Sequence, residues 1–180
     1  MLKTKIAVFV SGGGTNFEAL INAQENGKIP HGEIVLMVSS SKTAYALKRA
    51  ENHGIKSVVC SKKELGSQER FEEEILKNLE ENDIQLIVLA GFMSILSKEF
   101  TKKYENRIIN IHPSLIPSFC GEGFYGLHVH EAALKKGVKV TGATVHIVNE
   151  IPDGGPIIMQ KAVYIEENDT PEILQKRVME

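Results

Sequence analysis

The sequence has little cysteine, no marked charge imbalance and no long hydrophobic run. Its two cysteines, Cys60 and Cys120, are far apart and outside any CxxC pattern, so they indicate neither a disulfide framework nor a zinc knuckle. The 21 basic residues nearly balance the 23 acidic ones, for a net charge of -2, which excludes the electrostatic footprint of a nucleic-acid-binding protein. No apolar run approaches membrane-spanning length. We therefore expect a cytoplasmic monomer or homodimer that acts on small molecules, with neither nucleic acid nor membrane as partner.

What the sequence does contain is enough apolar material for one substantial core. The chain has 180 residues, 42% of them hydrophobic, which fits a single domain over residues 1–180. Its first five residues lead directly into the apolar run Ile6–Val10, which is too short for a secretory signal. Apolar runs then alternate with amphipathic stretches, as in βαβ units. This pattern predicts an α/β fold, with a Rossmann-like, doubly wound and mostly parallel sheet and helices on both faces.

The same alternation assigns individual elements. Apolar runs place strands at residues 6–10, 34–38, 57–59, 84–90, 108–111, 140–148 and 157–164. Helices are expected at 16–26, 43–53 and 128–136 and after Ser67 and Thr170, with Thr43 and Thr170 as caps. In the helix after Ser67 the spacing predicts one apolar face, formed by Phe71, Ile75, Leu76 and Leu79. The opposite face, formed by Glu72, Glu73, Glu74 and Lys77, is expected to face water.

A glycine-rich turn, Ser11-Gly12-Gly13-Gly14-Thr15-Asn16, joins the first strand to the first helix. Bare backbone N–H groups and the helix dipole can hold a phosphate at such a turn. It is neither a Walker A motif nor a GxGxxG fingerprint, because Phe17 and Glu18 follow Asn16. We predict a phosphate-binding loop in which Thr15 and Asn16 add side-chain hydrogen bonds; the alternative is a plain tight turn.

Three polar residues form a candidate catalytic group. Asn110 and His112 alternate along a strand end and so project to the same side, where ligands bind in open α/β sheets. Asp153 lies in a tight loop set by Pro152 and Gly154-Gly155-Pro156. An amide, an imidazole and a carboxylate together can carry acyl transfer without a metal or a nucleophilic side chain. The alternative is a capped strand end with an Asn turn.

The remaining histidines and Cys120 allow other interpretations. His146 shares a strand face with Thr144 and is expected either to support the catalytic group or to be a satisfied buried histidine. His128 and His130, together with the polar residues already named, raise the alternative of a metal site. Their neighbours are typical of a loop meeting a helix start, so we predict no metal. Cys120 has no neighbour that would lower its pKa, and we expect it to be a bystander.

Four blocks of the sequence, in order along nearly its full length, carry a family resemblance. The chain resembles the phosphoribosylglycinamide formyltransferases, folate-dependent enzymes of purine biosynthesis. The blocks are Val8-Phe9-Val10-Ser11-Gly12-Gly13-Gly14-Thr15-Asn16, Val88-Leu89-Ala90-Gly91-Phe92-Met93, Asn110-Ile111-His112-Pro113-Ser114-Leu115, and Gly142-Ala143-Thr144-Val145-His146 leading to Asp153-Gly154-Gly155-Pro156.

The resemblance implies a formyltransferase fold, with phosphate binding in the N-terminal half and catalysis in the C-terminal half. It implies transfer of the formyl group of 10-formyltetrahydrofolate, as co-substrate, to the amine of 5-phosphoribosylglycinamide in purine (IMP) biosynthesis. The substrate phosphate would bind at Gly14, Thr15 and Asn16. Folate would bind at Met93, Ser94, Ile95 and Leu96, with contributions from Gln68 and Asn110 and with 149–153 closing over it.

The implied chemistry is attack of the amine on the formyl carbon through a tetrahedral intermediate. Asn110 and protonated His112 would stabilise the oxyanion. Asp153 is expected to raise the pKa of His112 and to relay protons through a bound water. His146 would support this group from behind.

Three departures from the family pattern are visible. Gln68 stands where relatives often carry an arginine for the folate's glutamate tail, so Arg70 or Lys62 could replace it. The loop from Cys120 to Gly126 differs from the usual proline-containing one. The sequence stops at Glu180 inside an expected helix, which suggests an incomplete C-terminus. The alternatives are the catalytic cores of methionyl-tRNA formyltransferase or formyltetrahydrofolate deformylase, or a non-catalytic module that binds a phosphoribosyl ligand.

Overall fold

The computed structural model describes residues 2–180, which divide into two compact units, one up to Ile108 and one over Ile109–Glu180. The first unit holds β1 to β4 and α1 to α5: β1 (Thr4–Val10), α1 (Thr15–Glu25), β2 (Gly32–Ser39), α2 (Ala46–Asn52), β3 (Lys56–Val59), α3 (Lys62–Leu65), α4 (Gln68–Glu81), β4 (Leu86–Leu89) and α5 (Lys98–Lys103). The second unit begins within β5 (Ile108–His112) and continues with α6 (Leu127–Lys136), β6 (Val140–Ile147), β7 (Ile157–Tyr164) and α7 (Pro171–Met179). That the whole chain is a single domain stays a prediction.

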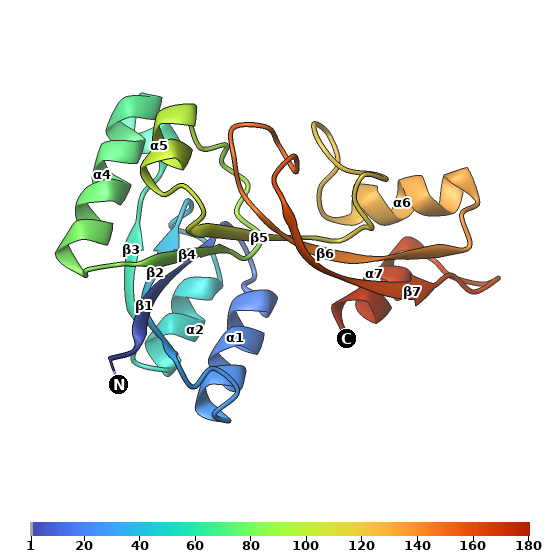
Figure 1. The fold of residues 1–180 in the computed structure, drawn as a ribbon, viewed down its shortest axis with the longest axis horizontal. Helices are drawn as coiled ribbons and strands as arrows, with labels where there is room; N and C mark the ends of the chain where they lie inside the picture. The colour runs from blue at the N-terminus through green and yellow to red at the C-terminus, as the bar shows by residue number, and fades with distance from the viewer. Residues whose placement is uncertain (1) are drawn as a thin grey trace. The chain divides into compact units, whose positions relative to one another are not determined.

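The first unit is a parallel sheet covered by helices on both faces. Its strands follow the order β3-β2-β1-β4, and every pair is parallel. Figure 1 shows α1 and α2 on one face of these strands and α4 and α5 on the other. Residues Ile6–Val10 of β1 are buried, as expected for a strand covered on both sides. The doubly wound arrangement predicted from the apolar runs is present in this unit.

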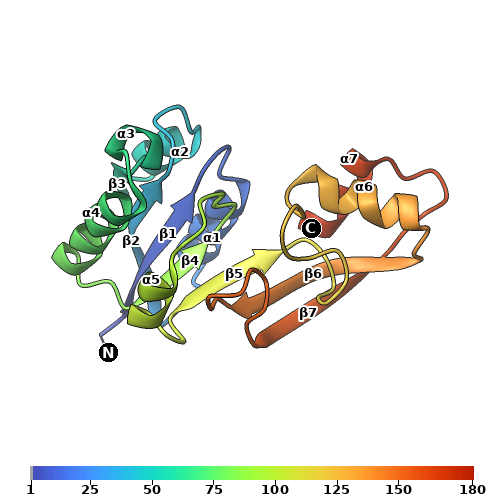
Figure 2. The same ribbon diagram turned by 90° about the horizontal axis from the view of Figure 1, so that it is seen from above.

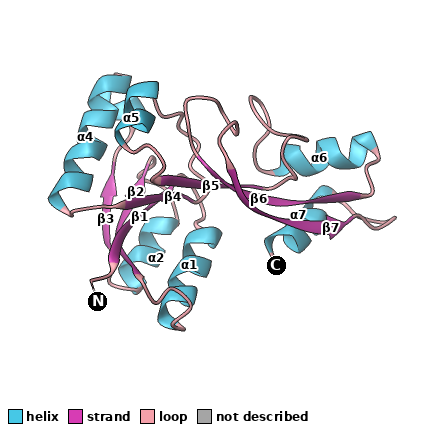
Figure 3. Cartoon of the chain, in the orientation of Figure 1, coloured by secondary structure: helices cyan, strands magenta, loops and turns pink. Residues whose placement is uncertain are grey.

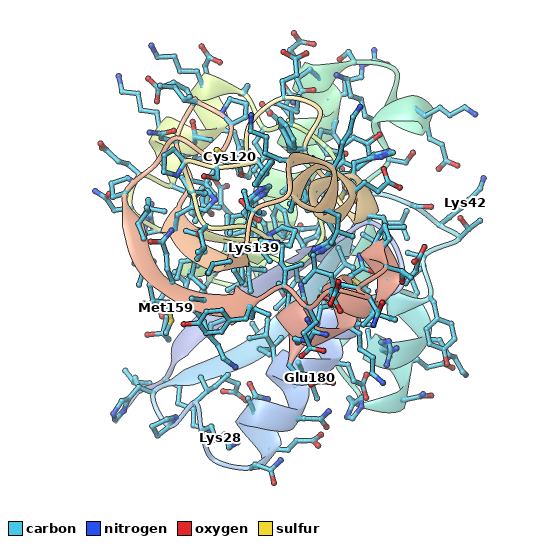
Figure 4. All side chains as sticks on the ribbon, turned by 90° about the vertical axis from the view of Figure 1, so that its right-hand side faces the viewer. Lys28, Lys42, Cys120, Lys139, Met159 and Glu180 are labelled. Carbon is cyan, nitrogen blue, oxygen red and sulfur yellow. The ribbon has the colours of Figure 1, made fainter. Side chains whose placement is uncertain are left out.

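The second unit is built on antiparallel pairing. β6 pairs with β5 on one side and with β7 on the other, both antiparallel. Helix α6 packs against α7 (Figure 2). Strand β7 is largely exposed, including the side chain of Met159, which is labelled in Figure 4. Two long irregular loops, residues 113–126 and 148–156, connect the elements of this unit (Figure 3).

Of the two caps predicted from the sequence, Thr170 is present and Thr43 is not, while Ser67 also caps the helix that follows it. The Ser67 Oγ accepts a hydrogen bond from the Arg70 N–H, and the Thr170 Oγ1 accepts one from the Ile173 N–H. Thr43 does not cap α2, which begins at Ala46 without a side-chain cap. The Thr43 hydroxyl instead contacts the Ser41 Oγ at 3.0 Å, in the turn before the helix. A local hydroxyl pair has therefore replaced the expected cap.

Glu72 is the second wrong expectation, because it does not face water. It lies on α4 between the apolar positions Phe71 and Ile75, and only 8% of its surface is exposed. The physical reason is tertiary: the chain at Ser97 brings its N–H and its hydroxyl to the Glu72 carboxylate, both at 2.6 Å. Helical spacing alone could not show these donors.

Among residues 2–180, no helix is both long enough and apolar enough to cross a membrane.

Candidate functional site

The glycine-rich loop leaves the start of α1 open. Gly14 precedes the helix with φ 72, in the left-handed region, and no side chain caps the first turn. A Cβ on Gly14 would lie 2.8 Å from the Ala46 Cβ, so the close approach of α2 also requires glycine. Thr15 is exposed and Asn16 is half-buried. The first-turn N–H groups are thus available to an anion.

Arg49 braces this loop, although no local sequence signal marked it. Its Nε donates to the Gly13 carbonyl oxygen at 2.9 Å, and its guanidinium pairs with Glu18 at 3.0 Å. The Ala46 N–H also donates to the Gly12 carbonyl oxygen at 3.2 Å. These bonds place the start of α2 against the loop. Only the folded contact between α1 and α2 reveals them.

The chain that follows β4, residues 91–97, is named here the post-β4 segment and has no regular secondary structure. The Met93 N–H donates to the Ser11 Oγ at 2.8 Å, and the Ser11 N–H donates to the Gly91 carbonyl oxygen at 3.0 Å. The side chains of Met93 and Ile95 are 55% and 76% exposed, whereas Leu96 is buried. The segment is therefore tied to the start of the glycine-rich loop and presents two apolar side chains to solvent.

The three predicted catalytic residues do lie together, within the second unit. The Asn110 Nδ2 lies 3.5 Å from the Asp153 Oδ1, and the His112 Nδ1 lies 3.4 Å from the Asp153 Oδ2. His146 joins them directly, with its Nε2 3.1 Å from the Asn110 Nδ2 and 3.4 Å from the Asp153 Oδ1. In the β5–β6 register His146 stands opposite Asn110. We refer to these four residues as the polar cluster.

Backbone geometry holds Asp153 in place. Its φ of 53 lies in the left-handed region, and the Gly154 N–H closes the turn onto the Ile151 carbonyl oxygen at 2.9 Å. A Cβ on Gly155 would overlap the Ile147 carbonyl oxygen, so only glycine fits there. The Gly121 N–H donates to the Asp153 Oδ2 at 2.9 Å. The Asp-Gly-Gly run therefore builds a loop that aims the carboxylate at β5.

The electrostatics of the polar cluster favour an ionised Asp153. Burial by itself would raise the pKa of Asp153, but the hydrogen bond with His146, the Gly121 N–H and the nearby His112 together hold it below its usual value. A carboxylate that receives such hydrogen bonds stays negative at neutral pH. It therefore provides a fixed negative charge between two imidazoles.

His112 has an oxygen acceptor on each side of its ring. Its Nε2 lies 2.7 Å from the Phe119 carbonyl oxygen, and its Nδ1 faces Asp153. An Nε2–H would donate to the Phe119 carbonyl oxygen, and the Nδ1 edge lies 3.4 Å from the carboxylate. The residue is 4% exposed, so an unmatched ring nitrogen would be costly. The ring is therefore held between the Phe119 carbonyl oxygen and the Asp153 carboxylate.

His146 also has a polar partner for each of its ring nitrogens. Its Nδ1 lies 2.9 Å from the Ile147 carbonyl oxygen and must donate there, whereas its Nε2 faces the Asn110 amide. The same Nε2 also lies 3.4 Å from the Asp153 Oδ1, so it contacts both the amide and the carboxylate. The Asn110 Nδ2 thus has two partners within the cluster, the His146 Nε2 at 3.1 Å and the Asp153 Oδ1 at 3.5 Å.

The remaining candidate residues, His128, His130 and Cys120, are not members of the polar cluster. Within the described residues no group of three or more His, Cys, Asp or Glu could hold a metal ion. His128 pairs with Glu131 at 3.0 Å, and His130 is fully buried. Burial and the charge of His112 lower the pKa of His130. Burial, together with the Asp153 charge, raises the pKa of the Cys120 thiol, which Figure 4 labels in the 113–126 loop.

Comparison with known proteins identifies the family. Residues 4–180 match the family model described as formyl transferase. The chain belongs to the formyl transferase family.

Relatives within this family bear names that fit the predicted resemblance. The chain is 40% identical over 176 residues to the phosphoribosylglycinamide formyltransferase of Bacillus subtilis, covering 97% of this chain and 86% of that protein. It is 47% identical over 178 residues to the trifunctional purine biosynthetic protein adenosine-3 of Gallus gallus, of which it spans 17%. It spans 61% of a chloroplastic phosphoribosylglycinamide formyltransferase of Arabidopsis thaliana, at 39% identity over 98% of this chain. The resemblance predicted from four sequence blocks is confirmed.

Solved formyl transferase structures confirm the fold class. The phosphoribosylglycinamide formyltransferase of Bacillus halodurans superposes with a TM-score of 0.89 at 42% identity, covering 97% of this chain and 87% of that one. Glycinamide ribonucleotide transformylase 1 of Geobacillus kaustophilus gives 0.90 at 37% identity, covering 98% and 91%. The α/β formyltransferase fold expected from the sequence is therefore correct.

Proposed function

We propose that this formyl transferase moves the formyl group of 10-formyltetrahydrofolate to the amine of 5-phosphoribosylglycinamide, a step of purine biosynthesis. The observation that carries the proposal is the polar cluster, in which an amide, two imidazoles and an ionised carboxylate meet at one strand end. Such a cluster supplies hydrogen-bond donors and a proton acceptor. Those are the groups that formyl transfer to an amine needs.

The chemistry follows from what each residue can donate or accept. The substrate amine forms a bond to the formyl carbon while the carbonyl electrons move onto oxygen. The Asn110 amide, on exchanging its 3.5 Å hydrogen bond to Asp153 for the substrate, and a protonated His112 stabilise that oxyanion. Collapse of the intermediate breaks the bond to the folate nitrogen, which takes up the proton that the amine releases. Asp153, through a bound water, carries that proton.

Substrate binding is assigned to the first unit. The open first turn of α1, with Gly14, Thr15 and Asn16, would hold the phosphate through backbone N–H groups. The post-β4 segment would receive the pterin, with Met93 and Ile95 as exposed apolar contacts and Ser94 and Leu96 within the same stretch. Gln68 contributes through its hydrogen bond to the Ile95 carbonyl oxygen at 3.1 Å. The small-molecule partners, cytoplasmic location and monomeric or dimeric state stay predictions.

One assay tests the proposal directly. Purified protein is given 10-formyltetrahydrofolate and glycinamide ribonucleotide, and formylated product and released tetrahydrofolate are both measured. We expect the two in equal amounts, and little release when the amine substrate is left out. Release without acceptor would instead indicate a deformylase. Transfer to methionyl-tRNA would indicate that other formyl transferase, and phosphoribosyl binding without turnover would indicate a non-catalytic module.

A further inference from the structure

One buried acid outside the polar cluster has a role that the chemistry above does not use. We infer that Glu72 is a positioning residue that, through Ser97 and Gln68, sets the shape of the post-β4 segment and thereby the affinity for the formyl-folate. The inference rests on the proposed function for the identity of the ligand. The clamp itself rests only on contacts within the first unit.

The Glu72 carboxylate is almost fully matched with donors. Its Oε1 accepts from the Ser97 N–H at 2.6 Å and from the Gln68 Nε2 at 2.5 Å. Its Oε2 accepts from the Ser97 hydroxyl at 2.6 Å. A carboxylate at 8% exposure is costly unless such donors surround it, so each partner holds the others in place. Hydrogen bonds to an ionised acceptor are also stronger than neutral ones.

The clamp fixes both the end and the middle of the segment. Ser97 ends the segment, and its Oγ also accepts from the Phe100 N–H at 3.1 Å, which caps α5. Gln68 donates its other amide hydrogen to the Ile95 carbonyl oxygen at 3.1 Å. Ile95 carries the most exposed apolar side chain of the segment. Glu72 thus controls where Ile95 is presented, without being exposed to a ligand itself.

The same geometry gives Gln68 a different role from a ligand for the glutamate tail. Both hydrogens of its amide are used, one on Glu72 and one on Ile95. The atom that remains free is its carbonyl oxygen, which accepts hydrogen bonds and does not bind a carboxylate. Gln68 is therefore the second arm of the clamp, and it acts on folate through the backbone of Ile95.

The test compares Glu72→Gln with Glu73→Gln. The control removes the same charge from the next residue of α4, which is exposed. In Glu72→Gln the new amide opposes the Gln68 donor and weakens the bonds to Ser97, so we expect exchange of the Ser97 amide hydrogen to be ~10-fold faster. We also expect the KM for 10-formyltetrahydrofolate to rise ~10-fold, with kcat and the KM for glycinamide ribonucleotide within about 3-fold of wild type.

Each outcome decides the matter. Unchanged exchange at Ser97, an equal rise in both KM values, or the same effect in Glu73→Gln would overturn the inference. If Glu72→Gln fails to fold, Gln68→Leu removes the hydrogen bonds to Glu72 and Ile95 but leaves those between Glu72 and Ser97, and it should raise the folate KM alone by about 3-fold. If wild-type protein transfers no formyl group, the proposed function fails and the folate role with it. The exchange measurement still judges the clamp by itself.

Discussion

At the scale of single residues, Asp153 is the position where charge matters most, because two imidazoles and a backbone N–H surround it. The change Asp153→Asn keeps the shape and an acceptor for the Gly121 N–H, but it removes the charge beside His112. We expect formyl transfer to fall by about 10²–10³-fold, similar to loss of an oxyanion donor. Steady-state kinetics with both substrates measures the loss. A matched circular dichroism spectrum shows whether folding is intact; full activity would contradict the assignment of Asp153.

The same carboxylate makes a pH-dependent contribution to stability. Its pKa in the folded protein lies below its usual value of 3.8, so the folded state favours the ionised form. This stabilisation is present above the unfolded pKa and is lost as the pH falls through the folded one. Urea unfolding of wild type and Asp153→Asn should differ by a constant amount between about pH 8 and pH 5, and the difference should shrink below about pH 4. A difference that grows in acid would contradict the depressed pKa.

Gly155 tests how tightly the loop that carries Asp153 is built. A methyl group there would overlap the Ile147 carbonyl oxygen, so Gly155→Ala must displace backbone. We expect a loss of about 1–3 kcal/mol in unfolding free energy, with a large fall in formyl transfer because Asp153 moves. Gly12→Ala, where no atom lies within 4 Å of the new Cβ, should change stability by less than about 0.5 kcal/mol. Equal destabilisation by both variants would count against the backbone clash.

At the scale of elements, α4 depends on its serine cap. The Ser67 Oγ accepts from the Arg70 N–H at 3.2 Å, so Ser67→Ala leaves that donor without its partner. We expect the unfolding free energy to fall by about 1 kcal/mol. Ser61 precedes α3 but makes no side-chain cap, so Ser61→Ala is a matched control with little expected effect. Thermal unfolding of both variants distinguishes a cap from a general serine effect.

Elements built on local chemistry were the predictable ones. The buried run Ile6–Val10, the helix start after Ser67 and the cap Thr170 follow from apolar pattern and backbone hydrogen bonding, which are readable within a few residues. The predictions for Thr43 and Glu72 were wrong because their side chains form hydrogen bonds with Ser41 and Ser97. Hydrophobic periodicity contains no information about such partners. Glu72 in particular met its partner 25 residues further along the chain.

At the scale of the whole molecule, the polar cluster was predictable in membership but not in arrangement. Asn110, His112 and Asp153 stood out by residue type at a strand end and in a tight loop. His146 was expected behind them, yet the antiparallel β5–β6 register puts it opposite Asn110 and in direct contact with Asp153. Register is set by tertiary pairing, so the sequence pattern showed the face of His146 and not its neighbours.

Ligand binding should stabilise the whole protein if the open turn before α1 holds a phosphate. A ligand that binds only the folded state adds about 2.7 kcal/mol at a concentration 100 times its Kd. We therefore expect glycinamide ribonucleotide to raise the Tm in a concentration-dependent way, and its dephosphorylated nucleoside to have a much smaller effect. Asn16→Ala should weaken the shift without abolishing it, since the backbone N–H groups of α1 remain. If the phosphorylated and dephosphorylated compounds stabilise equally, then the phosphate is not bound at this loop, and the ribonucleotide must be recognised through its amine and ribose alone.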